Sequence, residues 1–213
     1  PQNVSKMSEA VKRADDPKIN DDISNIIRNK RINTHPILRM LATGQMPNKR
    51  FDEMGRIYTD GSKKGNRAAY AVCAPGYDGL NFAGTVIGLD DIDRAELIAL
   101  LHASIIASNF REAHVYSDSQ YALDARLKAA EESVLKRKEP NYDLILLFRE
   151  LTRDQKLENV QFHKVMAHCL DSKDEKERKR RKEIMHKWFG TSTSQIIDGN
   201  DRADKLAQWA CDN

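Results

Sequence analysis

Four acidic residues stand where regular structure is expected to begin or end. Asp60 and Asp118 each follow a short β-rich run, and Glu96 and Asp204 stand early in predicted helices. Carboxylates gathered at one end of a sheet would repel one another unless cations neutralised them. Hard divalent ions such as Mg²⁺ and Mn²⁺ prefer oxygen ligands. A pair of such ions can activate water and stabilise the leaving oxygen of a phosphodiester, so the four acids predict a metal-dependent phosphodiesterase.

Each of these acids also has an ordinary structural interpretation. Asp60 precedes a glycine, and Asp-Gly pairs are typical of hairpin turns. Glu96 stands three residues after Asp93, which is the spacing of a capping box. Asp118 could cap the helix that follows it, and Asp204 would favour the dipole in the first turn of the last helix. The metal site is therefore indicated by the combination rather than by any one residue.

The elements that must position these acids follow from apolar periodicity and turn residues. Strands are predicted at 56–59, 68–74, 81–87, 113–117 and 160–165, and helices at 94–108, 122–130, 142–153 and 201–210. The order βββαβααβα predicts an α/β fold with a mixed five-stranded sheet, in which three antiparallel strands are followed by parallel ones and helices flank the sheet.

Residues 1–50 differ from the rest of the chain. They carry 10 basic and 5 acidic residues, a net charge of +5, and no Phe, Tyr or Trp. Asp21 or Asp22 could cap one short helix and Thr34 a second, so we expect a basic helical arm. Such an arm would contact phosphates rather than stack on bases. A plain linker or the tail of a preceding domain is the alternative interpretation.

Composition excludes several classes of protein. The 213 residues allow one ordinary domain plus an appendage. The longest apolar stretch, 97–107, is too short for a membrane span, and no secretory leader is recognisable. Cys73, Cys169 and Cys211 form no CxxC pair, which indicates reduced thiols and an intracellular protein without a zinc knuckle. Because the sequence begins with Pro1, we expect it to be a piece of a larger polypeptide.

Four segments resemble a known family: YTDGS at 58–62, RAEL at 94–97, YSDSQYAL at 116–123 and GNDRADKLA at 199–207. They are similar to ribonuclease H of type 1, including the domain carried by retroviral and retrotransposon reverse transcriptases. The resemblance covers about residues 56–213. It implies an RNase H-like fold, hydrolysis of the RNA strand of RNA/DNA hybrids, and two Mg²⁺ ions, replaceable by Mn²⁺, held by the four carboxylates Asp60, Glu96, Asp118 and Asp204. Asp201 competes for the fourth position, but the family's N-x-x-A-D-x-L-A pattern favours Asp204.

The resemblance also implies residues that handle protons and substrate. His168 matches a histidine on the loop after the last core strand, where an imidazole suits proton transfer near neutral pH. Ser119 and Gln120 are expected to bind substrate, with Gln120 at the minor groove of the RNA strand, and Asn141 is expected near a DNA phosphate. The alternative for His168 is an ordinary surface histidine, since Ala167 replaces the glycine that commonly precedes it.

The chain departs from cellular members in ways that matter for its partners. Asp-Asp-Ile-Asp at 90–93 replaces their Thr-Thr-Asn-Asn, which favours the reverse-transcriptase branch and a polymerase domain in the same polypeptide. The region 119–140 lacks the Trp of the usual basic handle. Instead, residues 169–199 form a long basic insertion, and we expect its cations to bind the hybrid: Arg178, Lys179, Arg180, Arg181 and Lys182. A solvated charged helix anchored by Trp188 and Phe189 is the alternative.

Two other classes of protein remain to be weighed. A DDE transposase or integrase shares the fold but places its glutamate last, whereas Glu96 comes second here. A non-catalytic domain that binds nucleic acid or acts as a scaffold would normally have lost a carboxylate, and all four are present. We therefore predict an arm over residues 1–50 and a catalytic domain over 51–213 that cleaves RNA/DNA hybrids; its oligomeric state is left open.

Overall fold

The computed structural model describes residues 51–86, 91–131, 139–153 and 157–213. The chain divides into two units, Pro1–Arg50 and Phe51–Asn213. The helices expected at Asp21 or Asp22 and at Thr34 lie outside the described residues, as does the predicted strand end at Ile87. The fold below is that of the second unit.

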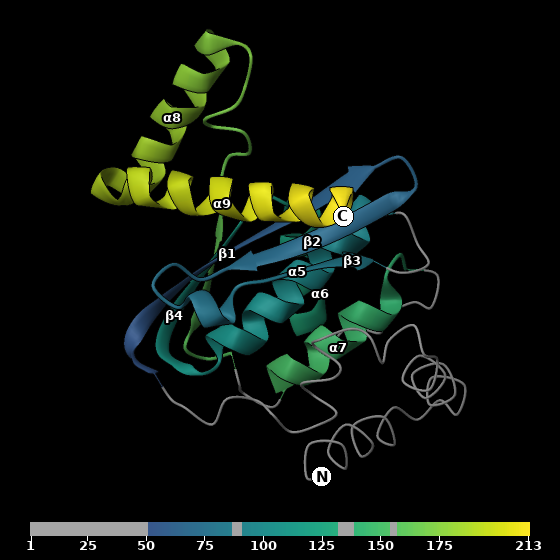
Figure 1. Cartoon of the computed structure of the whole chain (residues 1–213). Helices are drawn as coiled ribbons and strands as arrows, with labels where there is room; N and C mark the ends of the chain where they lie inside the picture. The colour runs from purple at the N-terminus through teal and green to yellow at the C-terminus, as the bar shows by residue number, and fades with distance from the viewer. Residues whose placement is uncertain (1–50, 87–90, 132–138, 154–156) are drawn as a thin grey trace. The chain divides into compact units, whose positions relative to one another are not determined.

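The second unit is built on five strands in the order β3-β2-β1-β4-β5 (Figure 1). β1, β2 and β3 are antiparallel, and β4 and β5 run parallel to β1. The strands are β1 (Phe51–Lys64), β2 (Arg67–Cys73), β3 (Phe82–Val86), β4 (Phe110–Ser117) and β5 (Val160–Lys164). The helices are α5 (Ile92–Ala107), α6 (Gln120–Ala130), α7 (Tyr142–Arg153), α8 (Glu175–Phe189) and α9 (Thr193–Asp212), with 3-10 turns at Asp78–Leu80 and Gly190–Ser192. The predicted mixed five-stranded sheet is confirmed.

Helices cover both faces of this sheet. α9 lies across β1, β2 and β3, while α5 packs on β1, β2 and β4, with α6 and α7 beside it (Figure 1). α5 is apolar on nearly all sides and is buried from Ala95 to Ala107, as expected for a helix enclosed by other elements. β2 is likewise buried from Ala68 onward, because helices cover the sheet on either side. None of the described helices has the length and apolarity needed to cross a bilayer.

The prediction that Asp60 and Gly61 form a hairpin turn was wrong. β1 continues through both residues, and its pairing with β2 places Asp60 opposite Ala71. The turn comes instead at Gly65, whose φ of 57° is the left-handed conformation that glycine adopts without steric cost. Asp60 therefore projects from the interior of a central strand rather than from its end.

The structural roles considered for Glu96 and Asp118 were also wrong. The α5 N-cap is Asp91, which accepts a hydrogen bond from the Asp93 N–H, so Glu96 stands beyond any capping box. The α6 N-cap is Ser119, whose hydroxyl accepts from the backbone of the first turn. Neither carboxylate is therefore used to cap a helix.

The last helix begins earlier than predicted. α9 starts at Thr193, so Asp204 lies in the helix interior instead of the first turn. Asp201 also lies in the interior and pairs with Lys205 at 2.6 Å. The extension is held by buried Ile196 and by Gly199, where an added Cβ would lie 2.3 Å from the ring of Tyr58. The absence of a side chain at Gly199 thus allows α9 to pack directly on the Tyr58 ring of β1.

The insertion contains a complete helix, α8, that connects β5 to α9 (Figure 1). Asp174 caps its start, and Gly190 ends it with a φ of 55°. Met185 is fully buried, and Phe189 packs edge-to-face on the ring of Tyr116. Trp188 is half exposed, so the expected anchoring applies to Phe189 and is wrong for Trp188.

Candidate active site

Parallel pairing places two of the acids side by side. Thr59 of β1 is in register with Ser117 of β4, so Asp60 inside β1 and Asp118 just after the end of β4 are neighbours. Glu96 reaches them from α5 across Gly61, where an added Cβ would lie 2.9 Å from the Glu96 carboxyl carbon. Oxygens of Asp60, Glu96 and Asp118 lie within 4.8 Å of one another.

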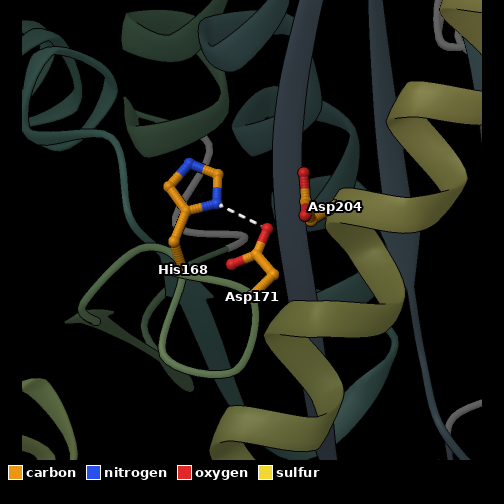
Figure 2. Close-up of side chains that lie close together, drawn as sticks. All are labelled: His168, Asp171 and Asp204. Carbon is orange, nitrogen blue, oxygen red and sulfur yellow. Dashed lines mark hydrogen bonds and ion pairs between the residues drawn. The ribbon is translucent and has the colours of Figure 1, made fainter. Parts of the chain in front are cut away.

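Asp204 joins this carboxylate group from the opposite side. Its side chain hydrogen-bonds to the Asp60 carboxyl and accepts from Gln208 Nε2 at 2.6 Å. Asp204 also belongs to a second group, in which its oxygen and ligand atoms of His168 and Asp171 lie within 4.8 Å (Figure 2). The two groups adjoin through Asp60 and Asp204.

A small hollow opens beside these groups. Its walls come from the residue after β4, the loop after β5 and α9, and they include Asp118, His168, Asp171, Asn200, Asp201 and Asp204. The fold therefore gathers residues that are more than 80 positions apart in the chain around one acidic hollow.

The electrostatics of the cluster follow from burial and like charge. Burial first, and then the charges of Asp118, Glu96 and Asp204, raise the pKa of Asp60 well above its ordinary value. The same causes, burial and then Asp118, raise the pKa of Glu96 to about 8. Without cations, the Glu96 carboxyl therefore holds its proton at neutral pH, and burial disfavours the charged form of Asp60 as well.

Three neighbouring groups offset part of the negative charge. Lys164 at the end of β5 donates from Nζ to the Asp118 backbone carbonyl and faces the carboxylates of Asp118 and Glu96. Burial lowers the pKa of Lys164, while those two carboxylates raise it. Asn200 Nδ2 lies 3.4 Å from Asp118 Oδ2, and the Gly61 backbone hydrogen-bonds to Glu96.

The chemistry of the donor set fits divalent cations. Among the described residues, Glu96 Oε2 and Asn200 Oδ1 are buried side-chain oxygens without a hydrogen-bond partner. An unpartnered buried oxygen of a carboxylate carries a desolvation penalty, which a bound cation would remove. Hard oxygen ligands from Asp60, Glu96, Asp118 and Asp204 are those that Mg²⁺ and Mn²⁺ prefer.

His168 lies at the rim of the cluster. Its Nδ1 is 3.2 Å from Asp171 Oδ2, and both side chains are about half exposed (Figure 2). When Nδ1–H donates to Asp171, the Nε2 atom remains for exchange of a proton with a substrate. His168 thus lies beside the acids with Nδ1 hydrogen-bonded to Asp171 and Nε2 available for proton exchange.

The residues Ser119, Gln120 and Asn141, which are expected to bind substrate, do not line this hollow, and their side chains are hydrogen-bonded within the protein. Ser119 is used as a helix cap, and exposed Gln120 donates to Asp124 at 2.8 Å. The Asn141 amide is held at both ends, because its oxygen accepts from Arg94 and its nitrogen donates to the Tyr121 hydroxyl.

The basic residues of α8 lie apart from the acidic hollow, and none of them lines it. Arg180 pairs with Glu177 at 3.5 Å, and Arg181 is turned toward the body of the protein. Arg178, Lys179 and Lys182 line a shallow groove along α8 and make no ion pair with another described residue.

Sequence reasoning missed three groups of this site: Lys164, Asp171 and Asn200. Asn200 stands inside the segment 199–207 that was already singled out, so its position was the available signal. Lys164 is a charged residue at the end of the last strand, and its position there gave only a weak signal. Asp171 gives no signal beyond its spacing of three from His168.

Comparisons with known proteins identify the family to which the chain belongs. The family model described as RNase H matches residues 52–212. No curated protein sequence matches the chain. Similar solved structures include RNase H1 from Halobacterium salinarum NRC-1, with a TM-score of 0.46, 22% identity, and coverage of 75% of this chain and 98% of that one.

Two further solved structures are similar to the chain. One is an N-terminal RNase H domain from Mycobacterium tuberculosis, solved as a fusion with maltose binding protein, with a TM-score of 0.45, 18% identity, and coverage of 75% of this chain and 94% of that one. The other is an RNase H1 isolated from compost by a metagenomic approach, with a TM-score of 0.43, 22% identity, and coverage of 75% and 96%. Because the family model spans most of the sequence, and the strand order agrees with that fold, the chain belongs to the RNase H family.

Proposed function

We propose that this chain is a metal-dependent endonuclease that hydrolyses the RNA strand of RNA/DNA hybrids. The observation that carries the proposal is the group of buried Asp60 and Glu96 with partly buried Asp118, in which Glu96 Oε2 has no hydrogen-bond partner among the described residues. Family membership supplies the class of reaction. A domain that only bound nucleic acid would have no use for buried carboxylates that repel one another.

Asp60, Glu96, Asp118 and Asp204 would hold two divalent ions. When bound, these ions supply Lewis-acid stabilisation of the phosphate and lower the pKa of the attacking water. Water adds to the phosphorus as the bond to the 3′-oxygen breaks, which leaves a 5′-phosphate and, once that oxygen has taken up a proton, a 3′-hydroxyl. His168 is the residue we assign to proton transfer, with Asp171 holding its Nδ1 so that Nε2 faces the substrate.

The neighbouring residues shape the site for this reaction. Lys164 places a fixed positive charge beside Asp118 and Glu96, which limits the charge that cations must neutralise. Asn200 orients Asp118 through its amide. Ser119 and Gln120 at the start of α6 are the residues we assign to the RNA strand, since contacts to the 2′-hydroxyl distinguish RNA from DNA. Asn141 is assigned to the DNA strand.

The cations of α8 support the proposed duplex substrate. Arg178, Lys179, Arg180 and Lys182 lie on a helix with exposed charges, and positively charged side chains that replace phosphate counterions provide most of the sequence-independent affinity for nucleic acid. Binding there would be independent of base sequence. It would also be weakened by salt.

We further propose that the chain acts within a reverse-transcriptase-type polypeptide and in an intracellular compartment. The support for the first is the departure from cellular members at 90–93, part of which lies outside the described residues. The support for the second is that Cys73, Cys169 and Cys211 are all free and buried. Co-purification with a polymerase domain translated from the same reading frame tests the first proposal, and fractionation of cells that express it tests the second.

Asp60→Asn tests the proposed activity. The parent should cleave labelled RNA in a hybrid with Mg²⁺ or Mn²⁺, spare single-stranded RNA and duplex DNA, and stop in excess chelator. Asp60→Asn should abolish cleavage, because it removes an oxygen ligand from a site that needs all four carboxylates. Asp201→Asn is the matched control, since Asp201 is paired with Lys205, and it should retain cleavage. Undiminished turnover by Asp60→Asn, or cleavage in chelator, would refute the proposal.

A further inference from the structure

The loop that carries His168 is tied to α8 by a hydrogen bond from an arginine. Arg181 Nη1 donates to the backbone carbonyl of Ala167 at 2.7 Å, and Arg181 Nε donates to Glu177 at 3.1 Å. The guanidinium is thus shared between its own helix and the residue directly before His168. A contact of this kind connects the insertion to the candidate active site.

Other contacts between this loop and α8 add to the arginine hydrogen bond. The Met166 N–H points at Met185 Sδ at 3.3 Å, and Met185 is fully buried. The Cys169 thiol donates to the Met166 carbonyl at 3.3 Å, which closes the loop on itself. The loop therefore rests on one face of α8 from Met166 to Cys169.

The position of the arginine bond matters because of the backbone of His168. His168 has a φ of 51°, in the left-handed region that non-glycine residues seldom occupy. The angle φ of His168 turns the peptide group that contains the Ala167 carbonyl relative to the His168 Cα. Arg181 holds that peptide group by its oxygen, so it fixes the direction in which the imidazole leaves the backbone.

The exposure of Arg181 separates it from the cations beside it. Its side chain is 24% exposed, whereas that of Arg180 is 72% exposed, although both approach Glu177. Two of its five N–H donors are already used within the protein, Nε on Glu177 and Nη1 on the Ala167 carbonyl, and the side chain is largely covered. Arg181 therefore differs from Arg180 in both its exposure and its hydrogen bonds.

We propose that Arg181 is a positioning residue for His168 and that α8 acts as the support of the histidine loop. The proposal rests on the proposed function, because His168 is assigned there to proton transfer. It removes Arg181 from the predicted substrate-binding set and leaves the exposed cations of α8 in it. Binding of a duplex on the outer face of α8 would then occur on the same helix that holds the histidine.

The test compares Arg181→Gln with Arg180→Gln, which removes the same charge from the next position. In Arg181→Gln, amide hydrogen exchange across residues 166–171 should accelerate about tenfold or more, because the loop loses its support. Its single-turnover rate with saturating hybrid should fall about tenfold, with affinity nearly unchanged, as expected when a proton-transfer residue is misplaced. In Arg180→Gln, exchange of the loop should stay at the parental level, and the slope of log affinity against log salt should fall by about one.

Two further variants distinguish a loss of positioning from a general folding defect. Arg181→Lys can still donate to the Ala167 carbonyl, so it should restore most of the loop protection and rate even if Arg181→Gln is poorly folded. In the double variant with His168→Ala, removing Arg181 should cost almost no further rate, because both changes act through the same imidazole.

The outcomes separate this inference from the proposed function. Unchanged loop exchange in Arg181→Gln, or a loss of affinity and salt slope that matches Arg180→Gln, would overturn the positioning role. Full additivity with His168→Ala would overturn it as well. If the parent fails to cleave a hybrid with either metal ion, the proposed function fails, while the exchange comparison still decides whether Arg181 supports the loop.

Discussion

At the scale of single residues, the site divides its chemistry between acids and a histidine. The buried carboxylates suit ions, because their burial makes unneutralised charge costly. His168 is half exposed and held only through Asp171 and its backbone, which suits a group that must exchange a proton with a substrate. Replacing a carboxylate should therefore reduce activity differently from replacing His168.

His168→Ala should leave an impaired but active enzyme. General acid-base catalysis typically contributes about 10²- to 10⁴-fold, so the single-turnover rate with saturating hybrid should fall within that range. The Mg²⁺ concentration for half-maximal rate should be unchanged, because the four carboxylates remain. His186→Ala, on the exposed side of α8, is the control and should match the parent. A His168→Ala rate equal to the parent would make this histidine an ordinary loop residue.

At the scale of elements, the position of α9 determines where Asp204 and Asn200 stand. The helix lies on β1 at Gly199, and the Tyr58 ring fills the space that a side chain would need. Tyr58 in turn stacks on Tyr116 of β4 with ring centroids 5.0 Å apart. The same contact that packs the helix therefore sets the depth at which Asp204 meets Asp60.

Gly199→Ala should destabilise the protein by about 1–3 kcal/mol, the usual cost of forcing an extra carbon into a packed interior. Urea unfolding should show an earlier midpoint with an unchanged m-value. Ser194→Ala, exposed on the same helix, is the control and should stay within about 0.5 kcal/mol of the parent. If Gly199→Ala instead stabilises by the usual helix gain of about 1 kcal/mol, the Tyr58 ring yields easily and the packing argument is wrong.

At the scale of the whole described unit, folding is linked to protons and to cations. The pKa of Glu96 is about 8 in the folded protein, against an ordinary value of 4.5. Between these values, the folded state binds more protons than the unfolded state, so the free energy of unfolding decreases as pH rises. The raised pKa of Asp60 acts in the same direction. Ions that bind only the folded carboxylates should oppose this loss.

Thermal unfolding in chelator should therefore show a melting temperature that falls from pH 5 to pH 8.5. For a domain of this size, about 1 kcal/mol corresponds to roughly 2–4 °C, so a fall of several degrees is expected. Millimolar Mg²⁺ should raise the melting temperature most at the upper end of this range.

Glu96→Gln should flatten the dependence on pH, because the amide has no charge to bury. Glu158→Gln, at an exposed position, should keep the parental slope and is the matched control. A parental melting temperature that does not change with pH in chelator, or does not respond to Mg²⁺, would contradict this linkage.

The mixed sheet and the order of elements other than α8 could be predicted from the sequence, because apolar periodicity and turn residues are local signals. The helix at Tyr142–Arg153 was predicted with its observed bounds, and the strands to within a few residues except for β1. The acids Asp60, Glu96, Asp118 and Asp204 could be named as candidates because each lies in a recognisable segment. Local patterns could not choose between a turn, a cap and a metal ligand for any of them.

Those choices depended on contacts between distant residues. Pairing of β1 with β2 placed Asp60 inside a strand, and packing of Gly199 on Tyr58 carried α9 back to Thr193. Lys164 reaches the carboxylates because β5 pairs with β4, and Arg181 reaches the His168 loop because α8 packs on that loop. Local sequence thus determined which elements form and which residues could do the chemistry. Tertiary structure decided their burial, partners and distances, since these depend on which surfaces exclude water together.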